Sequence, residues 1–242
     1  PSVFQIYDDE DWVDGGGNCV SSLCEDTDGN GISDACEAAT DGILEVPSEF
    51  ATVQGAIDMA VDGNIVLVGP GTYTSTNNEV INLYGKAITI RSIGGPEVTI
   101  LDGEGMRQVV KCITGEGSDT VIEGFTITGG YHSSANPGGG VYCSSTSPTI
   151  IDCIIDGNTA DAYGGGLYSE WGSPIIDGCT FTNNTAYYGG GIYCVYGTLM
   201  ITDCLIDGNT AKASWGHGGG IYGKWDSSII DGCIIRNNTA GA

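Results

Sequence analysis

The sequence predicts an all-β fold, a right-handed parallel β-helix, from a phrase that recurs at a nearly constant interval and from the short strands inside each repeat. The phrase "DGNTADAYGGGLY" at 156–168 returns as "TNNTAYYGGGIY" at 182–193 and as "DGNTAKASWGHGGGIY" at 207–222. A fixed period of roughly 20–50 residues indicates a repeat architecture in which each unit packs on its neighbours. We therefore assign residues 47–242 to the β-helix and residues 1–46 to a separate N-terminal segment.

Three independent sets of residues have the same repeat length, which predicts coils of 25–29 residues. The cysteines, the asparagine of each "NT" pair and the last glycine of each "GG" run all recur at intervals of 26, 25 and 29 residues. These sets are Cys153, Cys179, Cys204 and Cys233, then Asn158, Asn184, Asn209 and Asn238, then Gly140, Gly166, Gly191 and Gly220. Stacked coils would place each residue above its counterpart, so we expect every set to form a column.

Within a unit, the apolar residues form short, isoleucine-rich runs that Gly, Asn and Pro interrupt, as at Ile150, Cys153 and Ile155. Such runs are typical of short strands and not of helices. One unit cannot bury its apolar face, whereas stacked units share a continuous interior. The Leu/Asn consensus of leucine-rich repeats is absent, and the period is too long for calcium-binding nonapeptide arrays.

The recurring polar residues fit the corners between strands. Asparagine tolerates a left-handed backbone, so we expect the Asn of each "NT" pair to adopt it. Its side-chain amide can also bond to the same residue one coil away, and the Gly run supplies a second corner where no Cβ would fit. Asn183 and Asn237 match the N-glycosylation sequon, but the corner role already explains them.

Upstream of the repeats, "SEFATVQGAIDMAVDGN" predicts a capping helix at about 50–61, beginning after Ser48, that closes the first coil. Its apolar face would consist of Phe50, Val53, Ile57 and Val61. This stretch resembles the N-terminal cap of the pectin-lyase-like superfamily, which includes pectin methylesterases and many bacterial surface β-helices. "KAITIRSIGGPEVTILDGEG" (86–105) and "TVIEGFTITGG" (120–130) are similar to its first coils, so the resemblance covers about 48–242.

Composition limits the partners and the compartment. The 242 residues include 31 acidic and 7 basic side chains, and the formal charge of −24 disfavours nucleic acid and anionic membranes. No apolar run approaches the ~18 residues of a membrane span. The chain starts at Pro1 without Met or a leader, as a processed protein or a fragment would. Ten cysteines indicate an oxidising, extracellular or cell-surface location.

Residues 26–37, "DTDGNGISDACE", have oxygen ligands at the spacing of a calcium loop, with Gly31 at the position of the sharp turn. The expected Ca²⁺ ligands are the side chains of Asp26, Asp28, Asn30, Asp34 and Glu37 and the carbonyl of Ile32. Because the flanking residues make poor helices, an EF-hand is not expected. With Cys24 before it and Cys36 within it, the segment resembles a thrombospondin type 3 repeat, which implies a calcium-clamped spacer tied by a disulfide.

Four cysteines of the repeats predict disulfides within coils. Cys143 and Cys153 are ten residues apart, as are Cys194 and Cys204, and each pair spans the turn after a "GGxY" strand. We predict the disulfides 143–153 and 194–204. Two alternatives stay open. One is an interior ladder of free thiols, and the other is a set of bridges 153–179 and 204–233 between adjacent coils, which a strand spacing of ~4.8 Å nearly permits.

An aromatic stripe follows the inward aliphatic residue of each "GG" strand, and strand alternation turns it outward. Its first column would consist of Tyr142, Tyr168, Tyr193 and Tyr222. Three residues further on, a second column would consist of Trp171, Tyr196 and Trp225, with Ser145 breaking the series. Such a stripe could bind sugar rings or a protein partner, or its rings could lie flat and stabilise the stack.

No catalytic residue is assigned. His132 and His217 lie in the same type of turn three coils apart, roughly 14 Å even if they align, which is too far for a shared site. Polysaccharide lyases of this fold need an Arg or Lys base beside a calcium site, and the catalytic Gln and Asp motifs of the methylesterases are not found. The basic residues look dispersed along the chain: Arg91, Arg107, Lys111, Lys212, Lys224 and Arg236.

We therefore predict a secreted, calcium-binding structural or adhesive protein of a cell surface or an extracellular filament. The last unit stops at its Asn corner without a closing strand, so we expect successive copies to assemble head-to-tail. The apolar-alternating strand "SVFQIY" at 2–7 could pair there. The alternative is a carbohydrate-active protein, either a polysaccharide lyase or a glycan-binding module that uses the aromatic stripe.

Overall fold

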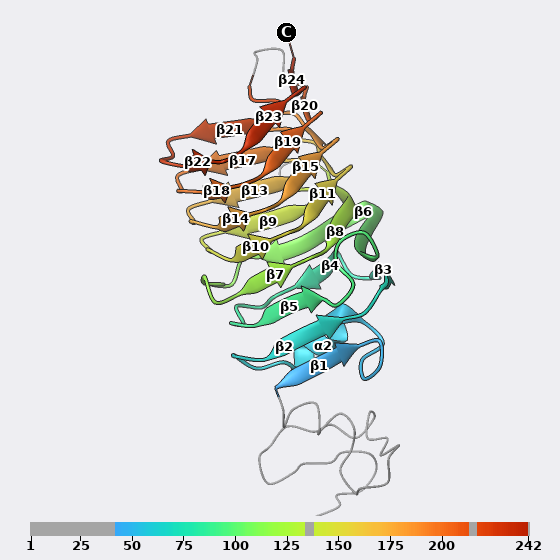
Figure 1. Cartoon of the computed structure of the whole chain (residues 1–242). Coiled ribbons are helices and arrows are strands. Elements are labelled where there is room, and N and C mark those ends of the chain that lie inside the picture. The colour runs from blue at the N-terminus through green and yellow to red at the C-terminus, as the bar shows by residue number, and fades with distance from the viewer. Residues whose placement is uncertain (1–41, 134–137, 213–216, 242) are drawn as a thin grey trace, which may run out of the picture.

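The computed structural model describes residues 42–133, 138–212 and 217–241, which wind into a right-handed parallel β-helix (Figure 1). The predicted fold is confirmed. The described elements are β1 (Ile43–Val46), α2 (Val53–Met59), β2 (Ile65–Val68), β3 (Gly71–Tyr73), β4 (Glu79–Asn82), β5 (Thr89–Ser92), β6 (Thr99–Cys112), β7 (Val121–Glu123), β8 (Thr126–His132), β9 (Val141–Ser144), β10 (Thr149–Ile151), β11 (Ile154–Asp156), β12 (Thr159–Ala160), β13 (Leu167–Glu170), β14 (Ile175–Asp177), β15 (Thr180–Thr182), β16 (Thr185–Ala186), β17 (Ile192–Val195), β18 (Met200–Thr202), β19 (Leu205–Asp207), β20 (Thr210–Ala211), β21 (Ile221–Lys224), β22 (Ile229–Asp231), β23 (Ile234–Arg236) and β24 (Thr239–Ala240).

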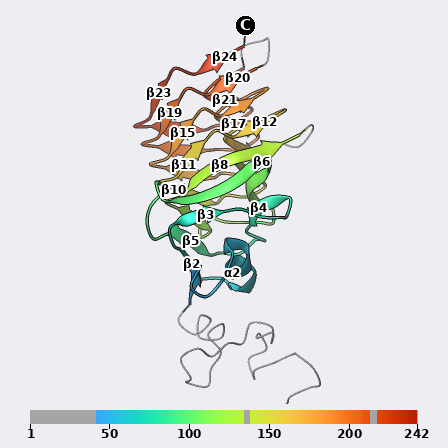
Figure 2. The same ribbon diagram turned by 90° about the vertical axis from the view of Figure 1, so that its right-hand side faces the viewer.

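Two sheets form the walls of the coil. One has eight strands in the order β1-β2-β5-β7-β10-β14-β18-β22, and in the other the long strands β6 and β8 connect the shorter strands of the coils around them (Figure 2). The register follows the sequence repeat, since Ile150 pairs with Ile176 and Ile176 pairs with Ile201. All three are buried in one continuous core, because each stacked isoleucine covers the one before it.

The asparagine column is a hydrogen-bonded ladder. Asn158 Nδ2 donates to Asn184 Oδ1 over 3.1 Å, and Asn184 Nδ2 donates to Asn209 Oδ1 over 3.0 Å. The backbone N–H groups donate to the same oxygens, and Asn209 repeats the pattern with Asn238. The predicted coil-to-coil bonding is confirmed. The left-handed conformation, however, belongs to the preceding, exposed residue, such as Asn183 at φ 54°, while the ladder asparagine is buried.

Helix α2 packs against β1, β2 and β4 near the N-terminal end of the described coil (Figure 1). Its N-cap is Thr52, whose hydroxyl accepts the hydrogen bond expected at this position, and not Ser48. Val53 and Ile57 are buried as predicted. Val61 was expected on the same face, but it is exposed because the helix ends two residues before it.

Gly165 shows why each coil repeats a run of glycines. A Cβ at this position would lie 2.5 Å from the Thr185 carbonyl oxygen and 2.6 Å from that of Gly190. Both distances are far below van der Waals contact, so only glycine fits where neighbouring coils approach this closely. The predicted corner without room for a Cβ is confirmed.

The described cysteines are free thiols. One column holds Cys153, Cys179, Cys204 and Cys233, and in it the Cys153 N–H lies 3.4 Å from the Cys179 Sγ. Cys143 belongs to a different column, where it pairs in register with Cys112 of β6, and Cys194 lies two coils above it. The predicted bridges 143–153 and 194–204 would each join two different columns and are not formed in the structure. The free, mostly buried thiols of the structure match the first alternative, an interior ladder of free thiols.

Candidate functional site

The predicted calcium ligands at 26–37, the cysteines Cys24 and Cys36, and the strand at 2–7 lie outside the described residues. Within the part of the chain that the structure describes, no group of three or more His, Cys, Asp or Glu side chains could hold a metal ion. Calcium binding therefore stays a prediction from ligand spacing.

The first aromatic column lies outside the main core and forms a small core of its own. Tyr168 pairs in register with Tyr193, and their rings stack with centroids 5.4 Å apart. Tyr163 and Tyr188 pack against them, so the rings of Tyr168 and Tyr193 are buried and are not accessible to a ligand. Burial raises the pKa of Tyr193 to about 12, and burial together with the Glu170 carboxylate raises the pKa of Tyr168.

The second aromatic column lies on an exposed corner. Trp171 stacks on Tyr196 with centroids 4.1 Å apart, and Tyr196 stacks on Trp225 at 4.8 Å. The three residues are 58%, 40% and 65% exposed. All have a left-handed backbone with φ between 52° and 55°, which is uncommon for large side chains. The predicted alignment of this column is observed.

Stacking limits what this exposed column can bind. Rings 4.1–4.8 Å apart leave no space for a ligand between them, so most of the surface they show to solvent is ring edge. One outer face belongs to Trp225, and the Lys224 ammonium covers it at 4.0 Å from the ring centroid. This geometry favours stabilisation of the coil stack over a platform for sugar rings.

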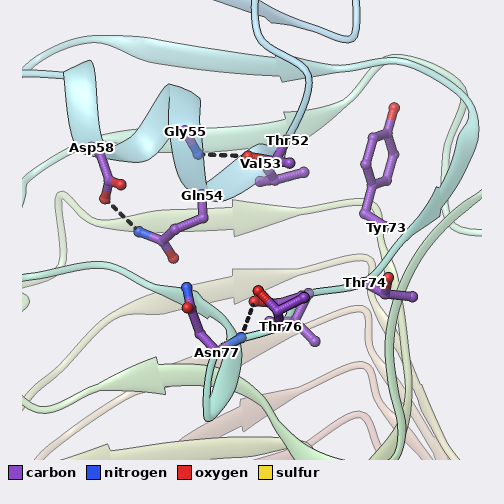
Figure 3. Close-up of a pocket in the computed structure, with 11 residues that line it drawn as sticks. Thr52, Val53, Gln54, Gly55, Asp58, Tyr73, Thr74, Thr76 and Asn77 are labelled. Carbon is purple, nitrogen blue, oxygen red and sulfur yellow. Dashed lines mark hydrogen bonds between the residues drawn. The ribbon is translucent and has the colours of Figure 1, made fainter.

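A hollow of about 360 Å³ lies between helix α2 and the segment that follows β3 (Figure 3). Its polar groups bond mainly within the protein. Gln54 donates to Asp58 and accepts from the Asn82 N–H, and the Tyr73 hydroxyl donates to the Gly69 carbonyl. Burial raises the pKa of Tyr73. These bonds join helix α2 to β4 and close the turn before β3. The polar groups that line the hollow therefore stabilise the fold.

A second hollow, of about 400 Å³, is lined by side chains from β4, β6 and β8. These strands lie side by side because β6 pairs with both β4 and β8 (Figure 2). Arg107, Lys111 and His132 all line it, together with Glu79 and Tyr131. The prediction that the basic residues are dispersed is therefore wrong for Arg107 and Lys111. The fold brings them together from one long strand.

Both cations of this hollow have a carboxylate nearby, but the two pairs differ. Arg107 Nη1 bonds to the Glu104 carboxylate, whereas Lys111 Nζ lies 3.6 Å from Glu79 Oε2. A separation of 3.6 Å is too long for a hydrogen bond. The Lys111 ammonium, whose side chain is 25% exposed, is therefore ion-paired with Glu79 without a hydrogen bond between them.

The histidines have separate surroundings. His132 Nδ1 lies 3.1 Å from the Ser133 carbonyl oxygen, so a proton on Nδ1 leaves Nε2 as an acceptor. His217 instead packs against Tyr188 and Tyr222, with centroids 5.0 Å and 5.2 Å away. As predicted, the two do not share a site. Beside His132, the Tyr131 hydroxyl donates to Asp161 over 3.2 Å, and this bond raises the pKa of Tyr131.

Comparisons with known proteins address the fold and the location. A family model described as "Right handed beta helix region" matches residues 49–211. A protein of Methanothermus fervidus named "Cell surface glycoprotein" is 32% identical over 144 residues, which is 56% of this chain and 21% of the relative. The chain thus spans about a fifth of the length of that relative. No solved structure matches it. Among the described residues, no helix is long and apolar enough to span a bilayer, and helix α2 has only 7 residues.

Proposed function

Because this chain belongs to the right-handed β-helix family, we propose that it forms a rigid structural or adhesive part of a cell surface. The location is supported by the relative named as a cell surface glycoprotein, which shares 32% identity over 144 residues. A secreted or surface setting also agrees with the acidic composition and the formal charge of −24.

The observation that supports this role best is that the repeated side chains make their contacts with the neighbouring coils, along the axis of the β-helix. Asn184 uses its side chain in hydrogen bonds to the coils on either side, and Trp171 stacks on Tyr196 one coil away. Continuous coil-to-coil bonding makes a stiff rod. Such a rod suits a protein that spaces or supports other parts of a surface. The same stacking gives less support to a glycan-binding stripe.

Protease shaving of intact cells tests the location. We expect a broad-specificity protease to release peptides of residues 42–241 from whole cells while a cytoplasmic marker protein stays intact. Peptides that appear only after lysis would contradict a surface role.

We also propose that residues 26–37 bind calcium, on the basis of their ligand spacing. Calorimetric titration of the full chain should detect one site with a Kd of about 10⁻⁴ M or tighter, within the range of extracellular modules and sensors. Asp28→Asn should abolish it. Asp11→Asn, in an acidic run without the ligand spacing, is the matched control. Equal effects of the two substitutions would leave only a general attraction between calcium and an acidic chain.

A further inference from the structure

One column of corner residues consists of glycines and two asparagines. The residues just before them pair in register from coil to coil, which places Gly129, Gly157, Asn183, Gly208 and Asn237 one above another. All five have a left-handed backbone, with φ between 54° and 69°. Glycine meets this requirement at three of the positions, and the hydrogen-bonded ladder uses the asparagine that follows. The corner role alone therefore does not explain why asparagine stands at 183 and 237.

Both asparagines begin an acceptor motif for N-linked glycans. Asn183 is followed two residues later by Thr185, and Asn237 by Thr239, and the sequence contains no other Asn-x-Thr or Asn-x-Ser. This motif marks surface positions of secreted proteins. Asn183 and Asn237 are exposed, whereas the ladder residue Asn184 beside the first of them is fully buried. The two acceptor motifs of the chain therefore place their asparagines on one line of its surface.

A carboxylate one coil below orients each of these amides. Asn183 Nδ2 donates to Asp156 Oδ1 over 2.8 Å, and Asn237 Nδ2 donates to Asp207 Oδ1 over 2.8 Å. Asp156 lies on the outer face of β11, because strand alternation buries the preceding Ile155. An amide Nδ2 has two hydrogens, so a sugar attached to it replaces one and leaves the other for the carboxylate. The observed hydrogen bond is thus compatible with a glycan that extends into solvent.

The spacing of the two asparagines leaves room for two glycans. Asn183 and Asn237 are two coils apart, which is about 10 Å at the ~4.8 Å spacing of paired strands. Substituents on adjacent coils would touch each other, as the rings of Tyr196 and Trp225 do at 4.8 Å. The coil between the two asparagines has Gly208, which has no side chain. The column therefore keeps its two acceptor positions apart.

We propose that Asn183 and Asn237 are modified with N-linked glycans, an inference that rests on the surface location proposed above. The donor is a sugar whose anomeric oxygen is esterified to phosphate. A bond forms between Nδ2 and the anomeric carbon, the bond from that carbon to the phosphate oxygen breaks, and the amide loses one proton. In the folded coil Asn184 is buried and the Thr185 N–H donates to the Asn158 carbonyl at 2.8 Å. The transfer therefore takes place before this coil closes.

Mass spectrometry of the chain purified from its own cells tests the proposal. We expect the proteolytic peptides that contain Asn183 and Asn237 to be heavier than their sequence by the mass of a glycan, with a sugar that stays on Nδ2 during fragmentation. Unmodified asparagine at both positions of a surface-exposed chain would overturn the inference and leave the proposed location standing. Sugar found only on hydroxyl side chains would also overturn it. A chain confined to the cytoplasm would contradict the location as well.

Substitutions made in the same cells separate the motif from the fold. Thr185→Ala should remove the glycan from Asn183 completely and leave the one on Asn237, whereas Thr185→Ser should retain both. Thr159→Ala is the matched control, because Thr159 pairs with Thr185 one coil below but follows a glycine corner. It should retain both glycans. An equal loss in Thr159→Ala would attribute the effect to a disturbed coil and overturn the proposal.

A double variant moves the acceptor along the column. Gly157→Asn/Asn183→Gly places the motif one coil lower and keeps residues with a left-handed preference at both corners. We expect the glycan at position 157 and none at position 183, in a chain whose melting temperature shows that it is folded. A folded double variant without a glycan at position 157 would overturn the claim that this exposed column presents the acceptors.

Discussion

Replacing Asn184 by alanine measures how much the asparagine ladder stabilises the stacked coils. Its Oδ1 accepts from the Asn158 N–H and Nδ2 at 3.0 Å and 3.1 Å. Its Nδ2 donates to the Ile155 carbonyl at 2.8 Å and to Asn209 Oδ1 at 3.0 Å. Asn184 is fully buried, so water cannot replace these bonds. The substitution removes all of them and leaves the Asn158 N–H without its acceptor.

The size of the loss follows from those bonds. A buried donor left without a partner costs about 1–3 kcal/mol, and each of the other lost hydrogen bonds costs about 1 kcal/mol. We therefore expect Asn184→Ala to lower the free energy of unfolding by about 4–6 kcal/mol. Guanidinium unfolding followed by tryptophan fluorescence measures this value.

The adjacent residue provides a matched control. Asn183 is exposed, and its φ of 54° suits glycine, which occupies the equivalent position at Gly157 and Gly208. Asn183→Gly should change the free energy of unfolding by less than about 1 kcal/mol. Equal losses for Asn183→Gly and Asn184→Ala would refute the reasoning, since the stability would then not depend on the buried ladder.

Three further substitutions, the first with a matched control, test other contacts. Gly165→Ala places a Cβ 2.5 Å from a carbonyl oxygen and should cost more than about 3 kcal/mol of unfolding free energy, whereas Gly117→Ala meets nothing within 4 Å and should be nearly neutral. Ser169→Cys should stabilise the fold by about 1 kcal/mol, because the buried Ser169 hydroxyl has no hydrogen-bond partner and its register neighbours are cysteines. Burial raises the pKa of Tyr193 to about 12, so the stability from its neutral phenol is complete below pH ~10 and is lost as the pH rises toward 12. Tyr193→Phe should reduce that alkaline loss in thermal unfolding.

Each of these substitutions has an outcome that contradicts its premise. A tolerated Gly165→Ala would mean that the coils are further apart than the structure shows. Destabilisation by Ser169→Cys would mean that the hydroxyl is satisfied after all, for example by a buried water. The same alkaline loss with and without Tyr193 would mean that this phenol titrates in the folded state as it does in the unfolded chain.

The repeated coils could be predicted in detail because the same residue type recurs at the same position of each coil. Asn158, Asn184 and Asn209 recur at the interval of one coil, and the observed ladder joins them. Features that depend on where a side chain points were harder to predict. Cys143 and Cys153 are separated by a single turn, and sequence spacing does not reveal that they enter different columns.

The second hollow could not be found from the sequence because it lies before the regular repeat. Strand β6 has 14 residues, and its pairing with β8 is irregular between Asp102 and Arg107. The repeat length is therefore irregular in this part of the chain. The position of Arg107 relative to β8 could not be derived from sequence spacing. The available signal was charge, since Arg107 and Lys111 are four residues apart in a chain with few cations.

Locating the sulfur atoms tests the stacking of the coils most directly. A crystal of the full chain, measured at a long wavelength, gives the sulfur positions from their anomalous scattering without reference to any atomic model. Stacked coils place the Sγ atoms of Cys153, Cys179, Cys204 and Cys233 on one line, at successive spacings of about 4.8 Å. A sulfur of this set that lies away from that line would contradict the in-register stack, and with it the ladder, the aromatic columns and the hollow.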